Sequence, residues 1–193
     1  MATYSYNWWE IIYFNGLFIS LSDNNIIASS PEGIDWTNRY TALSGLAGIA
    51  SNGEKLVVIN IAGKTLESFD GINWSPSNDL PAITTSNTGW RVIRYYKGKF
   101  VAIGGGYGSY AGQATAYSND GYNWQSGTPL SVHAYWSDLA CGNGLFITVS
   151  GNGFNSGNTI DVSEDGVKWV GSYLPAATSR CSIAYGNNKC FLS

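Results

Sequence analysis

A seven-residue motif, Ser-x-Asp-Gly-x-x-Trp, recurs along this chain and restricts its fold more than any other feature. It stands at Ser68–Trp74, Ser118–Trp124 and Ser163–Trp169. A degenerate copy with Glu in place of Asp occupies Ser30–Trp36. Four matches of this length are hard to obtain by chance, so the chain is built from internal repeats.

A second motif precedes each copy and consists of an apolar run, a short turn and another apolar run. Asn-Gly pairs dominate these turns, and they supply the positive φ that two-residue hairpins need. Each unit of about 43 residues therefore predicts two hairpins with tight turns, joined by longer connections. The turns lie at Asn15-Gly16, Asn52-Gly53, Lys97-Gly98, Asn143-Gly144 and Asn187-Asn188.

Each repeat is expected to form four strands, a to d. In the third repeat the pattern predicts strands at Trp90–Tyr96, Lys99–Gly104, Ala114–Ser118 and Tyr122–Ser126. Four-stranded units of this length are typical of β-propeller blades. We therefore expect an all-β propeller of about five blades in one domain, with repeats at about 8–44, 45–88, 89–133 and 134–179 and a half repeat at 180–193.

The last blade lacks strands c and d, and an open sheet edge invites aggregation. Two ways of covering it remain open. The Ala2–Asn7 stretch can add a strand and close the ring within the chain, or a second chain can complete it.

Composition excludes several classes of protein. Aromatic residues make up 15% of the chain and charged residues only 12%, which is unlike a disordered chain. The net charge is −3 without a basic cluster, so nucleic acid is not an expected partner. No long apolar run predicts membrane insertion, and no secretory signal peptide is seen.

The recurrence of the Ser-x-Asp-Gly-x-x-Trp motif is best explained by folding. The Asp can accept backbone N–H groups across the turn. The Trp ring can lie between neighbouring sheets, with its N–H reaching a carbonyl at the sheet edge. We therefore interpret these residues as stabilising the turns and not as a catalytic set.

These hairpins resemble the Asp-box, or bacterial neuraminidase, repeat, which usually has one more residue between Asp and Gly. The whole unit is most similar to repeats in bacteriophage tail fibres and related bacterial surface proteins. That resemblance implies a receptor-binding or lectin-like domain in a virion or at a cell surface, with a homotrimer as a further implication.

Sialidases that share Asp-boxes imply an arginine triad with tyrosine, glutamate and aspartate partners. Only Arg39, Arg91, Arg94 and Arg180 exist here, and they match no such set. The single histidine, His133, lies near Ser131 and Asp138, but no strained nucleophile elbow accompanies it. The sequence predicts no enzyme activity, no cofactor and no metal site.

Binding is expected on the b–c and d–a loops, since long loops at one end of a rigid scaffold usually carry function. Aromatic rings and amides there suit sugars. Recognition of a cell-surface glycan is the first functional hypothesis, and a structural propeller that mediates protein assembly is the alternative. Trp8, Trp90 and Trp136 also fit a role as repeated core residues. The predicted ligand contacts are Trp90, Tyr107, Tyr110, Gln113, His133, Trp136, Phe154, Asn155 and Asn158.

Overall fold

The computed structural model describes residues 7–41, 43–84, 88–106, 113–151, 159–175, 182–187 and 189–192. In these ranges every regular element is a β-strand. None of the described segments forms a helix that could cross a membrane. The prediction of an all-β chain is confirmed.

Four antiparallel sheets of four strands and a fifth of two strands make up the described chain. The first two sheets contain β1 (Trp8–Phe14), β2 (Leu17–Ser22), β3 (Ile27–Ser30), β4 (Thr37–Tyr40), then β5 (Leu46–Ser51), β6 (Leu56–Asn60), β7 (Thr65–Ser68) and β8 (Ser75–Pro76). The other three contain β9 (Thr88–Tyr96), β10 (Lys99–Gly106), β11 (Thr115–Ser118), β12 (Gln125–Ser126), then β13 (Trp136–Gly142), β14 (Leu145–Ser150), β15 (Thr159–Ser163), β16 (Val170–Tyr173), then β17 (Ile183–Gly186) and β18 (Lys189–Leu192).

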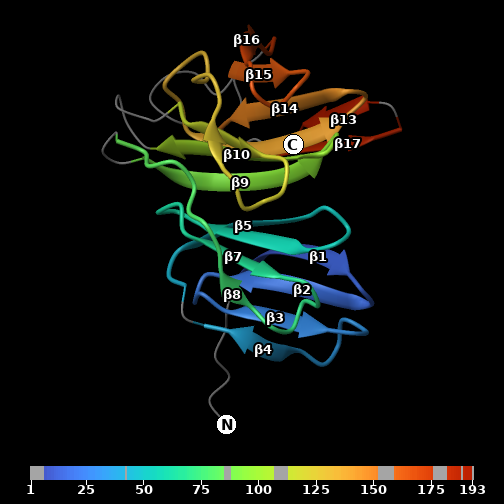
Figure 1. Ribbon diagram of the computed structural model, residues 1–193. Coiled ribbons are helices and arrows are strands. Elements are labelled where there is room, and N and C mark those ends of the chain that lie inside the picture. The colour runs from blue at the N-terminus through green and yellow to red at the C-terminus, as the bar shows by residue number, and fades with distance from the viewer. Residues whose placement is uncertain are drawn as a thin grey trace.

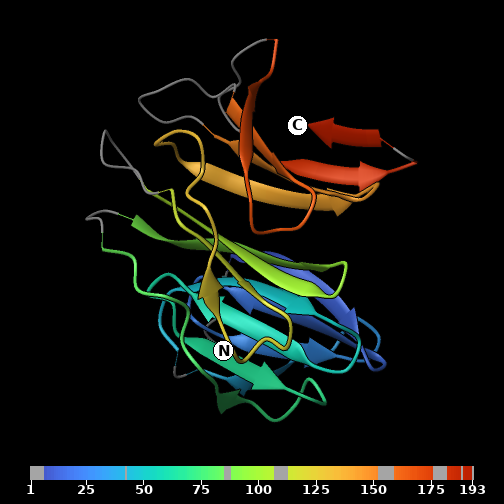
Figure 2. The same cartoon turned by 45° about the horizontal axis from the view of Figure 1, so that its top comes forward.

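The sheets follow one another in chain order, like the blades of a propeller. Figures 1 and 2 show the first two sheets in the lower half of the molecule and the others above them. The first strand of each sheet packs beside the first strand of the next, as β5 does against β9 and β9 against β13. Second strands add contacts, for example between β6 and β9. The first two strands of each sheet therefore make most of the contact with the following sheet.

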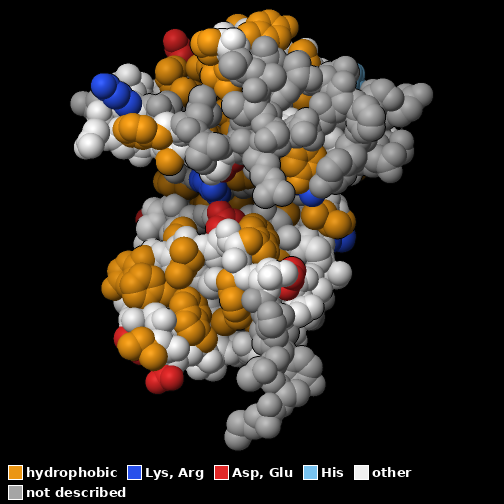
Figure 3. Space-filling view, turned by 180° about the vertical axis from the view of Figure 1, so that it is seen from behind, with side chains coloured by type: hydrophobic (Ala, Val, Ile, Leu, Met, Phe, Trp, Pro, Cys, Tyr) orange, Lys and Arg blue, Asp and Glu red, His pale blue; other side chains and the backbone are white. Residues whose placement is uncertain are grey.

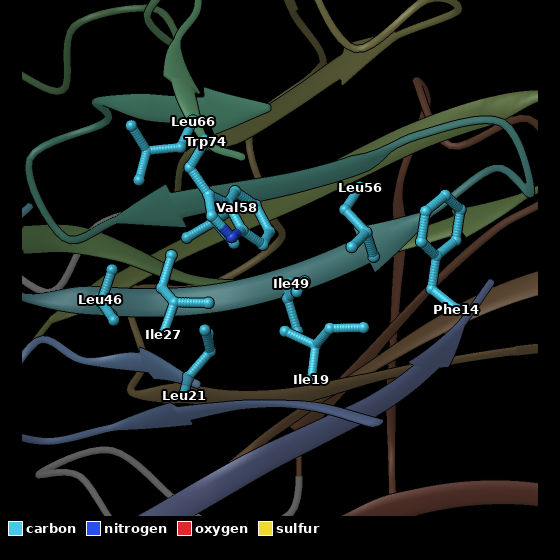
Figure 4. Close-up of a cluster of buried hydrophobic side chains, with 10 residues drawn as sticks. All are labelled: Phe14, Ile19, Leu21, Ile27, Leu46, Ile49, Leu56, Val58, Leu66 and Trp74. Atoms are coloured by element: carbon cyan, nitrogen blue, oxygen red, sulfur yellow. The ribbon is translucent and has the colours of Figure 1, made fainter. Parts of the chain in front are cut away.

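Packing between the first two sheets shows how each blade buries its neighbour. Ile19 on β2 lies beside Ile49 on β5 in Figure 4, and Trp74 lies over the same cluster. Ile19 is fully buried and Ile49 is 2% exposed. Side chains alternate between the two faces of each sheet, so successive residues of a strand point in turn toward the preceding and the following sheet.

The hairpins a–b are tight, as predicted, in the first, third, fourth and fifth sheets. In the third sheet Tyr96 pairs with Lys99 around Lys97 and Gly98. The second sheet differs, because Ser51 pairs with Leu56 and four residues form the turn.

The prediction of tight c–d turns is wrong, because the repeated motif itself forms a wide turn. In the third sheet Tyr117 pairs with Gln125, and β12 is only two residues long. Asp120 Oδ1 accepts the backbone N–H groups of Tyr122 at 2.8 Å and Asn123 at 2.7 Å. These bonds hold a loop where the sequence predicted strand from Tyr122 onward.

Three of the four motif tryptophans, Trp74, Trp124 and Trp169, lie between sheets, but the predicted N–H bonds to a sheet edge are wrong. Trp74 and Trp169 are 9% and 8% exposed and pack against the preceding sheet. Within the described residues, the indole N–H groups of Trp74, Trp124 and Trp169 have no hydrogen-bond acceptor. The Trp36 indole donates to Gly33 in its own turn at 3.1 Å, not to a sheet edge.

The predicted closing strand falls largely outside the described residues, which begin at residue 7. Asn7 precedes β1 and is tied to the turn after β2, because its side-chain amide donates to Asp23 at 2.6 Å and its carbonyl accepts the Asp23 N–H at 3.1 Å. Closure by residues 2–6 stays a prediction.

Candidate functional site

Five of the predicted ligand contacts lie outside the described residues. They are Tyr107, Tyr110, Phe154, Asn155 and Asn158. The remaining four are Trp90, Gln113, His133 and Trp136, and the structure places them at one end of the third and fourth sheets.

Gln113 and His133 lie where the sequence predicts, in the two kinds of long connection. The Gln113 side-chain amide donates to the Leu130 carbonyl, which ties the b–c loop of the third sheet to the following d–a connection. His133 is exposed in that connection, between β12 and β13. The two connections therefore emerge at the same end of the blade.

Trp90 and Trp136 are core residues in the structure. Their side chains are 1% and 0% exposed and belong to the clusters on either side of the third sheet. Trp90 also lines the floor of a small hollow of about 170 Å³ that Gln113 borders. Both rings thus have the place of repeated core residues, and contact with a ligand stays a prediction for them.

Among the described residues, those on the face of the first sheet that points away from the second sheet are largely exposed, and we call this face, which includes Trp8, Ile11 and Trp36, the open face. Trp8 occupies the position of Trp90 and Trp136, because each is the residue that pairs directly before the bulge of its inner strand. Yet Trp8 is 43% exposed while its two counterparts are buried. Figure 3 shows hydrophobic side chains gathered over the lower half of the molecule, where the first sheet lies.

The same contrast holds at other positions of the open face. Ile11 is 58% exposed, whereas Ile49, at the matching place on β5, is almost fully buried. Trp36 is 37% exposed, although the tryptophans that end the other motifs are buried or half-buried. The open face thus has the side chains of a blade interface without a blade against it.

A hollow of about 520 Å³ opens on this face. The rings of Trp8 and Trp36 stack with centroids 6.2 Å apart along it. Ser20 Oγ, one of the polar groups of this hollow, donates to the Glu10 carbonyl at 2.9 Å. The lining residues are Trp8, Trp9, Glu10, Ile11, Ser20 and Trp36.

Beside the open face, ionic side chains meet around the axis of the blades. Arg94 on β9 donates to Glu10 Oε1 on β1 at 2.6 Å and to Asp138 Oδ1 on β13 at 3.2 Å. Figure 3 shows basic and acidic side chains adjoining at the waist of the molecule. One guanidinium therefore connects the first, third and fourth sheets.

The carboxylates of Glu10 and Asp138 each also accept a backbone N–H from the next sheet. Glu10 Oε2 accepts the N–H of Ile49 on the next sheet at 3.1 Å, and Asp138 Oδ2 accepts the N–H of Ile183 on the next sheet at 3.0 Å. Burial raises the pKa of Glu10, and Arg94 counteracts part of that shift. The network thus links all five sheets through the axis.

A backbone irregularity opens space for this network. Each inner strand of the four complete sheets leaves one residue out of its pairing with the second strand, and such bulges redirect side chains. A hollow of about 340 Å³ lies at this level, bordered by Glu10, Arg94 and Asp138. The four bulged residues, Trp9, Ala47, Arg91 and Ser137, also border it.

Sequence reasoning missed both the open face and the axial network. Arg94 was considered only for a sialidase triad, and its opposite charges lie on strands far away in sequence. The repeat pattern does mark Trp8 as the counterpart of Trp90. Whether such a tryptophan is exposed, however, depends on whether another sheet packs against its face, which the repeat pattern does not show. The one sequence signal for the axial network is that Glu10 and Asp138, both acidic, occupy the same position of their repeats.

No group of three or more histidine, cysteine or acidic residues within the described ranges could hold a metal ion. Ser131, considered with His133 as a catalytic pair, instead donates its hydroxyl to Asp161 and its N–H to the same carboxylate at 2.7 Å.

No family model and no curated sequence matches the chain. Several solved structures do resemble it. YCF48 bound to D1 peptide aligns with a TM-score of 0.65 at 16% identity, over 94% of this chain and 58% of that one. YCF48 from Cyanidioschyzon merolae aligns with a TM-score of 0.64 at 15% identity, over 95% and 61%. The fold is that of a β-propeller.

A computationally designed protein, Ika8, shares the fold with a TM-score of 0.62 at 12% identity, over 93% of this chain and 53% of its own. The chain thus spans between about half and three-fifths of the propellers it matches. At these identities the likeness concerns the propeller fold alone, and it gives no support to the tail-fibre resemblance.

Proposed function

We propose that this chain is a non-enzymatic protein-binding module and that the open face of its first sheet is the binding surface. The observation that carries the proposal is the exposure of Trp8 at a position where Trp90 and Trp136 are buried. Water-exposed apolar patches of this kind mark interaction sites, because covering them with a partner is favourable.

A protein partner fits the open face better than a sugar does. Sugar hydroxyls need several free donors and acceptors beside the aromatic rings. Here Glu10 uses both carboxylate oxygens, on Arg94 and on the Ile49 N–H. Apolar side chains such as Ile11 and Tyr13, which are 58% and 62% exposed, provide no hydrogen bonds to sugar beyond one phenol.

The likeness to YCF48 bound to D1 peptide supports a protein ligand by analogy only, since folds are shared more widely than functions. Recognition of a cell-surface glycan by the loop end, as in a tail fibre, is the competing hypothesis. The proposal includes two points that rest on the sequence alone. The protein is located in a virion or at a cell surface, and it has no enzyme activity.

The proposal is tested by probing the labelled chain, at nanomolar concentration, on a random-peptide array and on a glycan array. We expect binding to peptides rich in apolar residues, and no glycan signal. Trp8→Ser should weaken peptide binding by roughly tenfold or more, about 1.4 kcal/mol. The matched control is Tyr122→Ser, which changes a 46% exposed aromatic residue in the third sheet's motif turn.

One result would replace the proposal with the glycan hypothesis. It is a specific glycan signal that survives Trp8→Ser and is lost in Gln113→Ala or His133→Ala. Silence on both arrays, at concentrations where the chain is monomeric, would contradict both hypotheses.

A further inference from the structure

We infer that the partner of the open face is a second copy of this chain, which docks the outer face of its fifth sheet head to tail against the first sheet. The inference rests on the proposed function, since it names the occupant of the same surface. It follows from comparing the interfaces inside the chain with the two ends of the blade series.

The three interfaces between the four complete sheets repeat one contact. A residue on the second strand of one sheet shares a buried cluster with a residue on the first strand of the next. Each of these residues is at most 2% exposed. The pairs are Ile19 with Ile49, Val57 with Ile93, and Val101 with Leu139.

Within the described residues, the first and the fifth sheets each expose one half of this contact. Ile11 has the position of Ile49 and is 58% exposed. Phe191 has the position of Ile19, because each is the third residue after its hairpin turn, and it is 53% exposed. One end of the chain therefore presents the surface that the other end lacks.

The fifth sheet is sufficient to make this contact although it has two strands. First and second strands carry most of the packing between consecutive sheets, as in β1 and β2 against β5. Strands β17 and β18 are the corresponding strands of the fifth sheet. A second copy would thus continue an interface that the chain already makes within itself.

Two complementary surfaces on one chain produce a heterologous contact. Such contacts yield a closed ring where the rotation permits it and a longer series of copies otherwise. In either product Ile11 of one copy lies against Phe191 of the other. A face-to-face dimer of two open faces would instead bury Ile11 twice and leave Phe191 in water.

The test measures molar mass by light scattering, from nanomolar to high micromolar concentrations of the full 193-residue chain. We expect association at the higher concentrations. Ile11→Arg and Phe191→Asp should each leave only monomer, because each charge would be buried without a partner. Both positions are exposed in the single chain, so circular dichroism should show intact folding.

Mixing the two variants gives the sharpest result. One interface of the mixed pair has the wild-type residues, and the other places Arg opposite Asp. We expect a complex with one copy of each variant where neither variant associates alone. Tyr122→Arg is the matched control, since Tyr122 is exposed away from both end faces, and this variant should associate like the unchanged chain.

Three results would overturn the inference. One is a monomer at every concentration, and another is a dimer that Ile11→Arg abolishes but Phe191→Asp leaves intact. The third is a mixture of the two variants that stays monomeric. A monomeric chain that still binds peptides through Trp8 would refute the second copy while leaving the proposed function standing.

Discussion

Arg94 donates to Glu10 at 2.6 Å across the axis of the propeller, joining the third sheet to the first. The two side chains are 34% and 16% exposed, so the pair is partly shielded from water. Such pairs are costly to break, because the remaining charge keeps its burial and loses its partner. The bond also holds the first sheet, and with it the open face, in register with the rest of the arc.

Replacing Arg94 with Met should lower the free energy of unfolding by about 2–4 kcal/mol, because the Glu10 carboxylate is then left unpaired in a buried position. Urea denaturation at neutral pH measures the change. The double variant Glu10→Gln/Arg94→Met should recover part of the loss. Equal stability of Arg94→Met and the unchanged chain would show that the axial network does not hold the sheets together.

Much of the blade architecture follows from sequence, and the reasons are local. Turn residues such as Asn15 and Gly16 set hairpins through their own backbone preferences. The wide c–d turn was missed because Asp120 offers its carboxylate to two N–H groups, which favours a loop over strand pairing. Open-face exposure and the Arg94 network depend on contacts between distant strands, and the carboxylates at the matching positions Glu10 and Asp138 are the one trace of those contacts in the repeat pattern.

Asp70→Ala, Asp120→Ala and Asp165→Ala should each reduce stability by about 1–2 kcal/mol, because each removes an acceptor for two backbone N–H groups in its turn. Thermal and urea unfolding measure the loss. Peptide binding at the open face should persist in the folded variants. Loss of binding with unaltered stability would show that the turns have a direct role in recognition.

Acid should destabilise the protein through these same turns. In the folded chain the N–H groups of Asn73 and Ile72 lower the pKa of Asp70, and those of Lys168 and Val167 lower the pKa of Asp165. The unfolded value is about 3.9. Because the folded pKa lies below it, this stabilisation is present at neutral pH and is lost as pH falls below about 4.

Stability curves from pH 7 to pH 2 test the acid effect. Asp70→Asn removes the titrating group and keeps an acceptor oxygen. The gap in stability between Asp70→Asn and the unchanged chain should therefore narrow as the pH falls. A gap that stays constant across the range would contradict the assigned pKa shift.

Two glycines separate backbone strain from packing between blades. Gly98 and Gly121 have φ of +77° and +68°, so Ala is strained at either position. A Cβ at Gly98 meets nothing within 4 Å, whereas one at Gly121 would lie 2.8 Å from Val57 Cγ2 on the preceding sheet. Gly98→Ala should cost about 1 kcal/mol and Gly121→Ala about 2–3 kcal/mol. Equal urea midpoints would contradict tight packing of the motif turn on its neighbour.

The central claim is that a protein surface covers the open face, and thiol footprinting of Ile11→Cys tests it most directly. The modification rate by N-ethylmaleimide is followed by mass spectrometry, with and without a saturating peptide from the array or concentrated unlabelled chain. The account predicts fast modification of the introduced thiol in the free monomer and strong protection in the complex. Tyr122→Cys should react equally in both states. An equal rate for the Ile11→Cys thiol, free and bound, would place binding elsewhere and contradict the account.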